Sequence, residues 1–181
     1  MHVKLPTLLV LMALTAVAST GPAGIAEGQP VPQHLIPQAM QVSQKEALEQ
    51  LSALAKRKGP VGVAATKALV VYKKHAARER EFILPPLTLL PYLADGKITP
   101  DMSWALAMTD RVKAEREEIF EEHTKITDSL NLLTEAAAKA HDNDAKEFAE
   151  SAAADSLNDI EVLQPTLFII GDILRAKLQG H

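Results

Sequence analysis

The sequence contains no cysteine, which excludes disulfide bonds, thiolate metal sites and cysteine nucleophiles. Aromatic residues make up only 4% of the 181 residues, and no stretch keeps the alternating pattern of a β-strand for long. Sheets depend on aromatic and β-branched residues, so this scarcity argues against an all-β fold. The formal net charge is −4 and the basic residues form no stripe, which argues against nucleic acid as a partner. Any metal ion would have to be held by His, Asp and Glu.

Hydrophobic residues, 47% of the chain, are rich in Ala and Leu, and the length suffices for one domain with a core. Their spacing predicts four helical stretches, at residues 37–58, 61–84, 99–140 and 144–178. The breaks coincide with Gly59–Pro60 and with Pro85–Pro86, and a further interruption is expected before Pro165. Long helices with short connections are typical of an antiparallel up-down four-helix bundle. We therefore predict an all-α domain over residues 36–181.

The N-terminus has the pattern of a secretory signal peptide. His2 and Lys4 precede an apolar run over residues 5–18, which is too short to span a bilayer comfortably. Cleavage is expected after Ala18 or Ala26. We interpret residues 1–26 as the signal and residues 27–35 as a flexible segment, which predicts a periplasmic or secreted protein. The alternative is an uncleaved signal that anchors the protein to the membrane.

Polar residues interrupt the apolar stripe of each predicted helix near its middle. They are Gln44 on the first helix, His75 and Glu79 on the second, His123 on the third, and Asp155 and Asp159 on the fourth. Buried carboxylates need compensating positive charge, and a metal ion supplies it directly. Bundles build di-iron and di-manganese sites from such side chains on facing helices. The alternative is that some of these residues face solvent at the helix edges.

The second and fourth helices repeat one another at an offset of eighty residues. His75 aligns with Asp155, Glu79 with Asp159, and Pro85 with Pro165. The chain therefore consists of two pseudo-symmetric helical hairpins, each of which offers ligands to a site between the halves. The alternative is an old duplication retained only for packing.

At these residues the chain resembles the hemerythrin-like cation-binding family. The matching segments are HAAREREFILPPLTLLP from His75, EEHTKI around His123, and DSLNDIEVLQPTLFIIGDIL from Asp155. The resemblance implies a four-helix bundle, often with a non-haem di-iron centre that binds or senses oxygen or handles iron. It covers roughly residues 34–178 and is weakest in the first helix.

The ligand set follows the family in part. His75, Glu79 and His123 match its ligand types, whereas Gln44 and Asp155 stand where histidines are usual. Asp159 replaces a longer acid, and Thr127 stands where oxygen carriers have a further histidine. These departures argue against reversible oxygen binding, and they favour a harder, carboxylate-rich set of the kind that iron or manganese uses.

Three functions follow as hypotheses. The first is an exported hemerythrin-like metal-binding protein that holds iron, as a di-iron centre, or manganese or another divalent metal, with dioxygen as a further ligand. The second is a non-metal structural or interaction bundle whose vestigial site is satisfied by His–Asp hydrogen bonds. The third is an oxidase or peroxidase-like enzyme, for which the sequence offers no catalytic residue. The acidic run at residues 115–122 is expected to be a solvated face.

Overall fold

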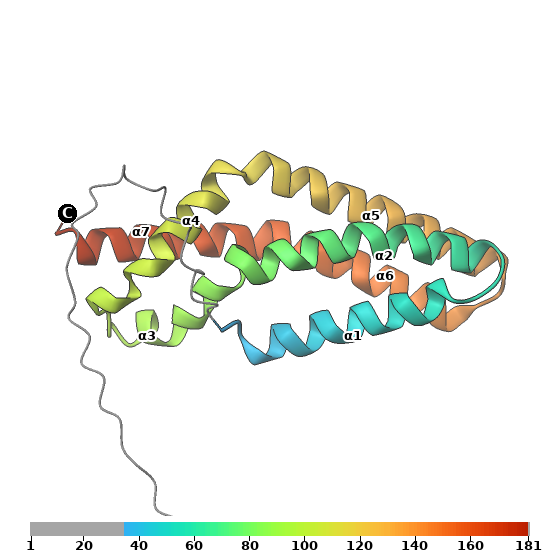
Figure 1. Ribbon diagram of the computed structural model, residues 1–181, viewed down its shortest axis with the longest axis horizontal. Helices are drawn as coiled ribbons and strands as arrows, with labels where there is room; N and C mark the ends of the chain where they lie inside the picture. The colour runs from blue at the N-terminus through green and yellow to red at the C-terminus, as the bar shows by residue number, and fades with distance from the viewer. Residues whose placement is uncertain (1–34, 181) are drawn as a thin grey trace, which may run out of the picture. The chain divides into compact units, whose positions relative to one another are not determined.

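A computed structural model describes residues 35–180 of the chain. The predicted signal peptide, residues 1–26, and residues 27–34 of the predicted flexible segment lie outside the described residues. Residues 35–180 contain helices and turns but no strand, which confirms the all-α prediction (Figure 1).

The first predicted stretch is confirmed closely, the second ends in a π-helix, and the third and fourth are subdivided. The elements are α1 (Gln38–Ala55), α2 (Pro60–Arg78), the π-helix η1 (Glu79–Ile83), the 3₁₀ helix η2 (Pro85–Leu89), α3 (Leu90–Ala94), the 3₁₀ helix η3 (Pro100–Ser103), α4 (Trp104–Ala114), α5 (Arg116–Lys139), α6 (Asn143–Asn158), the π-helix η4 (Asp159–Leu163) and α7 (Gln164–Leu178). The third predicted helix is thus two helices, and the fourth is interrupted before Pro165 as expected.

The long helices α1, α2, α5 and α6 pack side by side, α1 on α2, α2 on α5 and α5 on α6 (Figure 1). One apolar cluster lies among these four helices and includes Leu51, Ala68 and Ile126. A second cluster joins η1 and η2 to α4 and α7 and includes Phe82 and Ile119. Along α2 and along α5, the polar residues of the predicted site fall between these two clusters.

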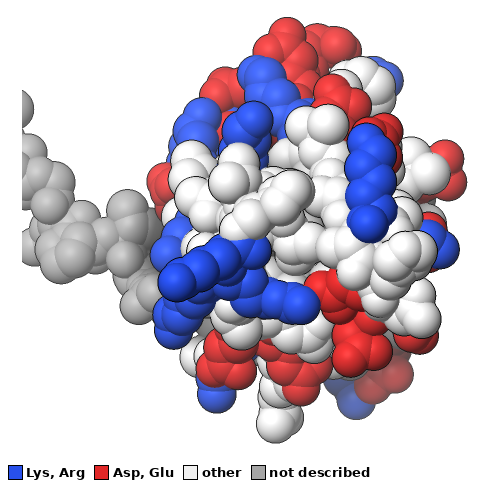
Figure 2. All heavy atoms as spheres, turned by 90° about the vertical axis from the view of Figure 1, so that its right-hand side faces the viewer, with Lys and Arg blue, Asp and Glu red and all other residues white. Residues whose placement is uncertain are grey.

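The α1–α2 and α5–α6 turns are tied together by an ion pair. Arg57 Nη2 lies 2.6 Å from Asp142 Oδ2, and Asp142 also caps α6 by accepting from the backbone N–H of Ala145. A side chain at Gly62 would place its Cβ 1.7 Å from the carbonyl oxygen of Arg57, so the first turn requires glycine there. Figure 2 shows this end of the molecule, where charged side chains of both signs surround an uncharged centre.

The prediction of one continuous helix over residues 99–140 is wrong, because the helix is interrupted at Glu115 (φ −95°, ψ 14°). The Glu115 carboxylate accepts hydrogen bonds from Arg78 and Arg111 there, and Arg111 Nε lies 2.7 Å from it. Val112 and Ile119, seven residues apart on either side of the break, are both buried in the second apolar cluster. Arg116, which lies between them and directly follows the break, is exposed.

The repeat in the sequence has a counterpart in the backbone. The π-helix η1 begins at Glu79 and η4 begins at Asp159, again eighty residues apart. π-Bulges of this kind are frequent at functional sites. No helix within residues 35–180 combines the length and the apolar character that crossing a membrane requires.

Candidate metal centre

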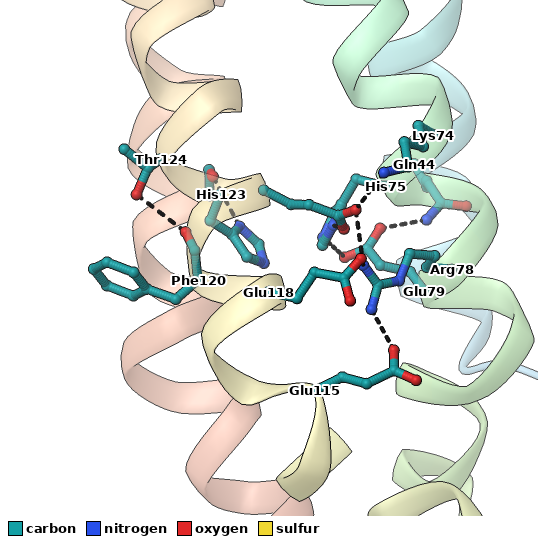
Figure 3. A network of polar contacts seen from close by, with 12 residues as sticks. Gln44, Lys74, His75, Arg78, Glu79, Glu115, Glu118, Phe120, His123 and Thr124 are labelled. Carbon is teal, nitrogen blue, oxygen red and sulfur yellow. Dashed lines mark hydrogen bonds and ion pairs between the residues drawn. The ribbon is translucent and has the colours of Figure 1, made fainter. Parts of the chain in front are cut away.

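His75 lies near the end of α2, is 3% exposed, and is held between two carboxylates. Its Nδ1 lies 3.1 Å from Glu122 Oε2, and its Nε2 lies 3.4 Å from Glu79 Oε1 (Figure 3). Because a carboxylate accepts, Nδ1 is the donor to Glu122. Burial opposes a charge on the ring, but the contacts with Glu79 and Glu122 outweigh it and raise the pKa of His75.

His123 projects from α5 onto His75. The ring centroids are 4.3 Å apart in an edge-to-face arrangement, and His123 is 4% exposed. Its Nδ1 lies 2.9 Å from the hydroxyl oxygen of Ser156 on α6, which holds the orientation of the ring. Burial, together with the charge on His75, lowers the pKa of His123 to about 4. His123 is therefore a neutral imidazole at neutral pH.

Glu79, the first residue of η1, is 8% exposed and contacts side chains from two helices, α1 and α2. Gln44 Nε2 of α1 donates to Glu79 Oε2 at 2.6 Å, and Gln44 is itself buried. Burial alone would raise the pKa of Glu79, but the contacts with His75 and Gln44 lower it. The structure thus brings together His75, Glu79, His123 and Gln44, four of the six residues predicted from the sequence.

The two aspartates of the fourth helix differ in their surroundings. Asp159 is half-buried, and burial together with the negative charge of Glu79 raises its pKa to about 7. Asp155 is exposed, at the rim of the cavity described below, so its expected place on a buried stripe is wrong. The core-facing position at this level belongs to its neighbour Ser156, which is 5% exposed and contacts His123.

Glu122 is the residue that sequence patterns missed, because it lies in the acidic run expected to face solvent. It is 8% exposed and, besides His75, it pairs with Arg78 at 2.8 Å and with Lys74 at 3.1 Å. In Figure 3, Arg78 and Lys74 of α2 extend toward the acidic side chains of the α4–α5 junction and α5. The signal for Glu122 in the sequence was the excess of basic residues on the last two turns of α2, because these residues need acidic partners on a neighbouring helix.

Two cavities adjoin this cluster. The outer one has a volume of about 410 Å³ and is lined by Gln44, Glu79, Asp155, Asn158 and Asp159, together with the apolar residues Met40, Leu84, Val162 and Leu163. The inner one is lined by Glu79, His123, Asp159 and Gln164, with apolar walls of Ile83, Val112, Ile119, Leu163 and Leu167. Both cavities share Glu79, Asp159 and Leu163, so these residues form the boundary between the outer pocket and the core.

The donor types suit a divalent ion, but their arrangement does so only in part. Within residues 35–180, no group of three or more His, Asp or Glu side chains is spaced so as to hold a metal ion. Gln44 donates a hydrogen bond to Glu79 Oε2. His75 Nε2 lies 3.4 Å from Glu79 Oε1 but forms no hydrogen bond with any of the described residues. Coordination by this set would therefore require side chains to move.

Comparison of the chain with protein-family models, with curated proteins and with solved structures finds no match in any of the three.

Proposed function

We propose that this protein is an exported, hemerythrin-like antiparallel four-helix bundle that binds a divalent metal ion, iron by its family resemblance, in the core. The observation that carries the proposal is the way the two histidines are held. Each ring has its Nδ1 engaged, in His75 by Glu122 and in His123 by Ser156. Metal-ligating histidines show this pattern, because the second ring nitrogen is fixed by an outer hydrogen bond and Nε2 is left for the ion.

The charges of the cluster support the same proposal. Glu79 and Asp159 both line the inner cavity beside His123, and burial together with the negative charge of Glu79 raises the pKa of Asp159 despite the charge on His75. A bound cation would supply positive charge beside that carboxylate. His75, Glu79, His123 and Asp159 are the residues we assign to it, and we place Gln44 and Asp155 on the outer side, toward solvent. Because the assigned ligands lie only on the inner side of the cluster, they fit one ion better than two.

A metal-free network is the second candidate, and a specific observation favours it. Gln44 donates to Glu79, and His75 lies 3.4 Å from Glu79 and 3.1 Å from Glu122, so the four side chains form one continuous set of polar contacts without a ligand. A buried network satisfied in this way can fix a fold without a ligand. In this case the cluster serves stability and the position of α2 against α5.

Metal content separates the two candidates. The chain is expressed with its N-terminal segment, purified without chelator, and analysed by plasma mass spectrometry before and after anaerobic loading with ferrous iron. We expect about one equivalent of iron or manganese in the wild type, and none in the double variant His75→Ala/Glu79→Ala, because that variant removes two of the four proposed donors.

The matched control is His141→Asn. His141 is an exposed histidine in the α5–α6 turn with a positive φ of 56°, a conformation that asparagine tolerates. This variant should bind as much metal as the wild type. Unchanged metal content in the double variant would overturn the proposed ligands, and a wild type that takes up no ferrous iron would leave the metal-free network as the function of the cluster.

A further inference from the structure

A buried carboxamide at the start of α7 has an amide nitrogen without a hydrogen-bond partner among the described residues. Gln164 is only 7% exposed, and its Nε2 makes no hydrogen bond with any residue between 35 and 180. The side chain lines the inner cavity together with Glu79, His123 and Asp159. A buried amide donor without an acceptor is destabilising, so it calls for a ligand in the space that it faces.

The internal repeat indicates that packing alone does not require an amide here. Gln164 precedes Pro165 as Leu84 precedes Pro85, eighty residues earlier. Leu84 is 2% exposed and belongs to the apolar cluster, so an apolar side chain fills the equivalent position in the first half. The second half has a hydrogen-bond donor in its place, which lines the cavity beside the polar cluster.

The size and walls of the inner cavity specify the ligand. The inner cavity has a free volume of about 10 Å³, which is the space that one water molecule needs. Water can accept from Gln164 Nε2 and donate to the carboxylates of Glu79 or Asp159, which also line the space. An anion would instead meet both carboxylates. A single neutral oxygen ligand therefore satisfies the walls best.

We propose that Gln164 is a positioning residue that holds one water molecule in the inner cavity, between its carboxamide, Glu79 and Asp159. The outer cavity shares two of these residues and supplies the route by which the water exchanges. The water site does not require an ion. Its further role, as the exchangeable ligand beside a bound cation, rests on the proposed function.

The test is nuclear magnetic resonance on the full chain after treatment with chelator. We expect the Gln164 side-chain amide protons, and the methyl groups of Val112 and Leu167, to show Overhauser contacts with a water that stays longer than one molecular tumbling time. Gln164→Met keeps the length of the side chain but removes the donor, so it should abolish the methyl–water contacts. Gln164→Leu, which copies the residue at the equivalent position 84, is the second variant if the methionine variant does not fold.

Thr134→Val is the matched control, because the Thr134 hydroxyl is also buried without a partner among residues 35–180 but lines neither cavity. It should retain every water contact. A wild type without water contacts at Gln164, or methyl–water contacts that survive in both Gln164 variants, would overturn the proposal. Metal content measured on the same samples separates the two claims, since a bound water in a protein that takes up no metal would contradict only the proposed function.

Discussion

Glu122 fixes His75 in place and thereby sets the chemistry of the cluster. It accepts from His75 Nδ1 and pairs with Arg78 and Lys74, so one buried carboxylate joins α5 to three residues of α2. Burial alone would raise the pKa of Glu122, but the contacts with His75, Arg78 and Lys74 lower it to about 2. A carboxylate with a lowered pKa stabilises the folded state wherever it is ionised.

Glu122→Gln should therefore destabilise the protein by about 2–4 kcal/mol at pH 7, because it leaves Arg78 and His75 without their buried partner. The wild-type advantage is complete above the ordinary carboxyl pKa of about 4.5 and is lost as the pH falls toward about 2. Urea unfolding at several pH values measures it. Glu118→Gln is the control, since Glu118 pairs with Arg78 at an exposed position and should cost less than about 1 kcal/mol. Equal costs would contradict the role of Glu122.

His123 and Asp159 should have opposite effects on stability below neutral pH. The pKa of His123 is lowered to about 4, so the unfolded chain takes up that proton first and stability falls between about pH 6.5 and 4. The pKa of Asp159 is raised to about 7, so the folded chain takes up that proton first and stability rises as the pH falls from about 7 to 4. In the wild type these effects partly cancel.

Asp159→Asn removes one side of this balance. In chelator-treated protein, the variant should lose stability between pH 7 and pH 4 more steeply than the wild type, with a divergence on the order of 2 kcal/mol. The measurement is the free energy of urea unfolding against pH. Asp155→Asn, at an exposed position one turn earlier, should diverge far less, because the charge of Asp155 is the smallest contribution to the raised pKa of Asp159. If the curve for Asp159→Asn runs parallel to the wild-type curve, the pKa of Asp159 is not raised in the folded protein.

Helical spacing predicted the buried positions of Gln44, His75, Glu79 and His123, because each lies within a regular α-helix or, for Glu79, directly after one, where one turn predicts the next. It failed at Glu122, since a long helix between two partners buries more than a single stripe, and α5 contacts both α2 and α6. Spacing also could not reveal which of two neighbours, Asp155 or Ser156, faces the core.

At the scale of the elements, the sequence predicted where helices lie better than how they are interrupted. Gly59 and Pro60 mark the passage from α1 to α2, and Pro85 and Pro165 closely follow the π-helices η1 and η4. The break at Glu115 has neither proline nor glycine, and it depends on Arg78 and Arg111, which come from two different helices. Such a tertiary cause leaves no local signature. The π-helices are likewise visible in the sequence only as the offset of eighty residues.

The contact between α4 and α7 offers a test at this scale. A Cβ at Gly171 would lie 2.6 Å from Thr109 Oγ1 and 2.9 Å from Thr109 Cβ, and Thr109 is fully buried. Gly171→Ala should therefore destabilise the protein by about 1–3 kcal/mol through overpacking. In a Thr109→Ala background the same substitution should cost less, because the hydroxyl group at 2.6 Å is removed, while the Cβ at 2.9 Å remains.

A thermal double-mutant cycle measures this coupling between Thr109 and Gly171. Additive costs in the two backgrounds would mean that α4 and α7 adjust to the extra methyl group. A coupled result would show instead that the closeness of the two helices, which positions Gln164 and Leu167 under the polar cluster, is fixed by this one contact.

At the scale of the whole molecule, the polar cluster lies between two apolar cores, so a ligand bound there joins the two cores. A ligand that binds only the folded state stabilises it by about 2.7 kcal/mol at one hundred times its dissociation constant. For a domain of this size that corresponds to a rise in Tm of about 5–10 °C. We expect ferrous iron to raise the Tm of the wild type by this amount under anaerobic conditions.

The rise should also depend on pH, because the ion and a proton compete for His75 Nε2, and the pKa of His75 is raised. Lowering the pH from about 8 to about 6 should therefore reduce the ferrous shift in Tm, while His141→Asn should show the same shift as the wild type at each pH. His75→Ala/Glu79→Ala should show no shift at either pH. If the wild type also shows none, the cluster acts as a metal-free network, and its stability should then respond to pH through His75 and Glu122 whether or not a chelator is present.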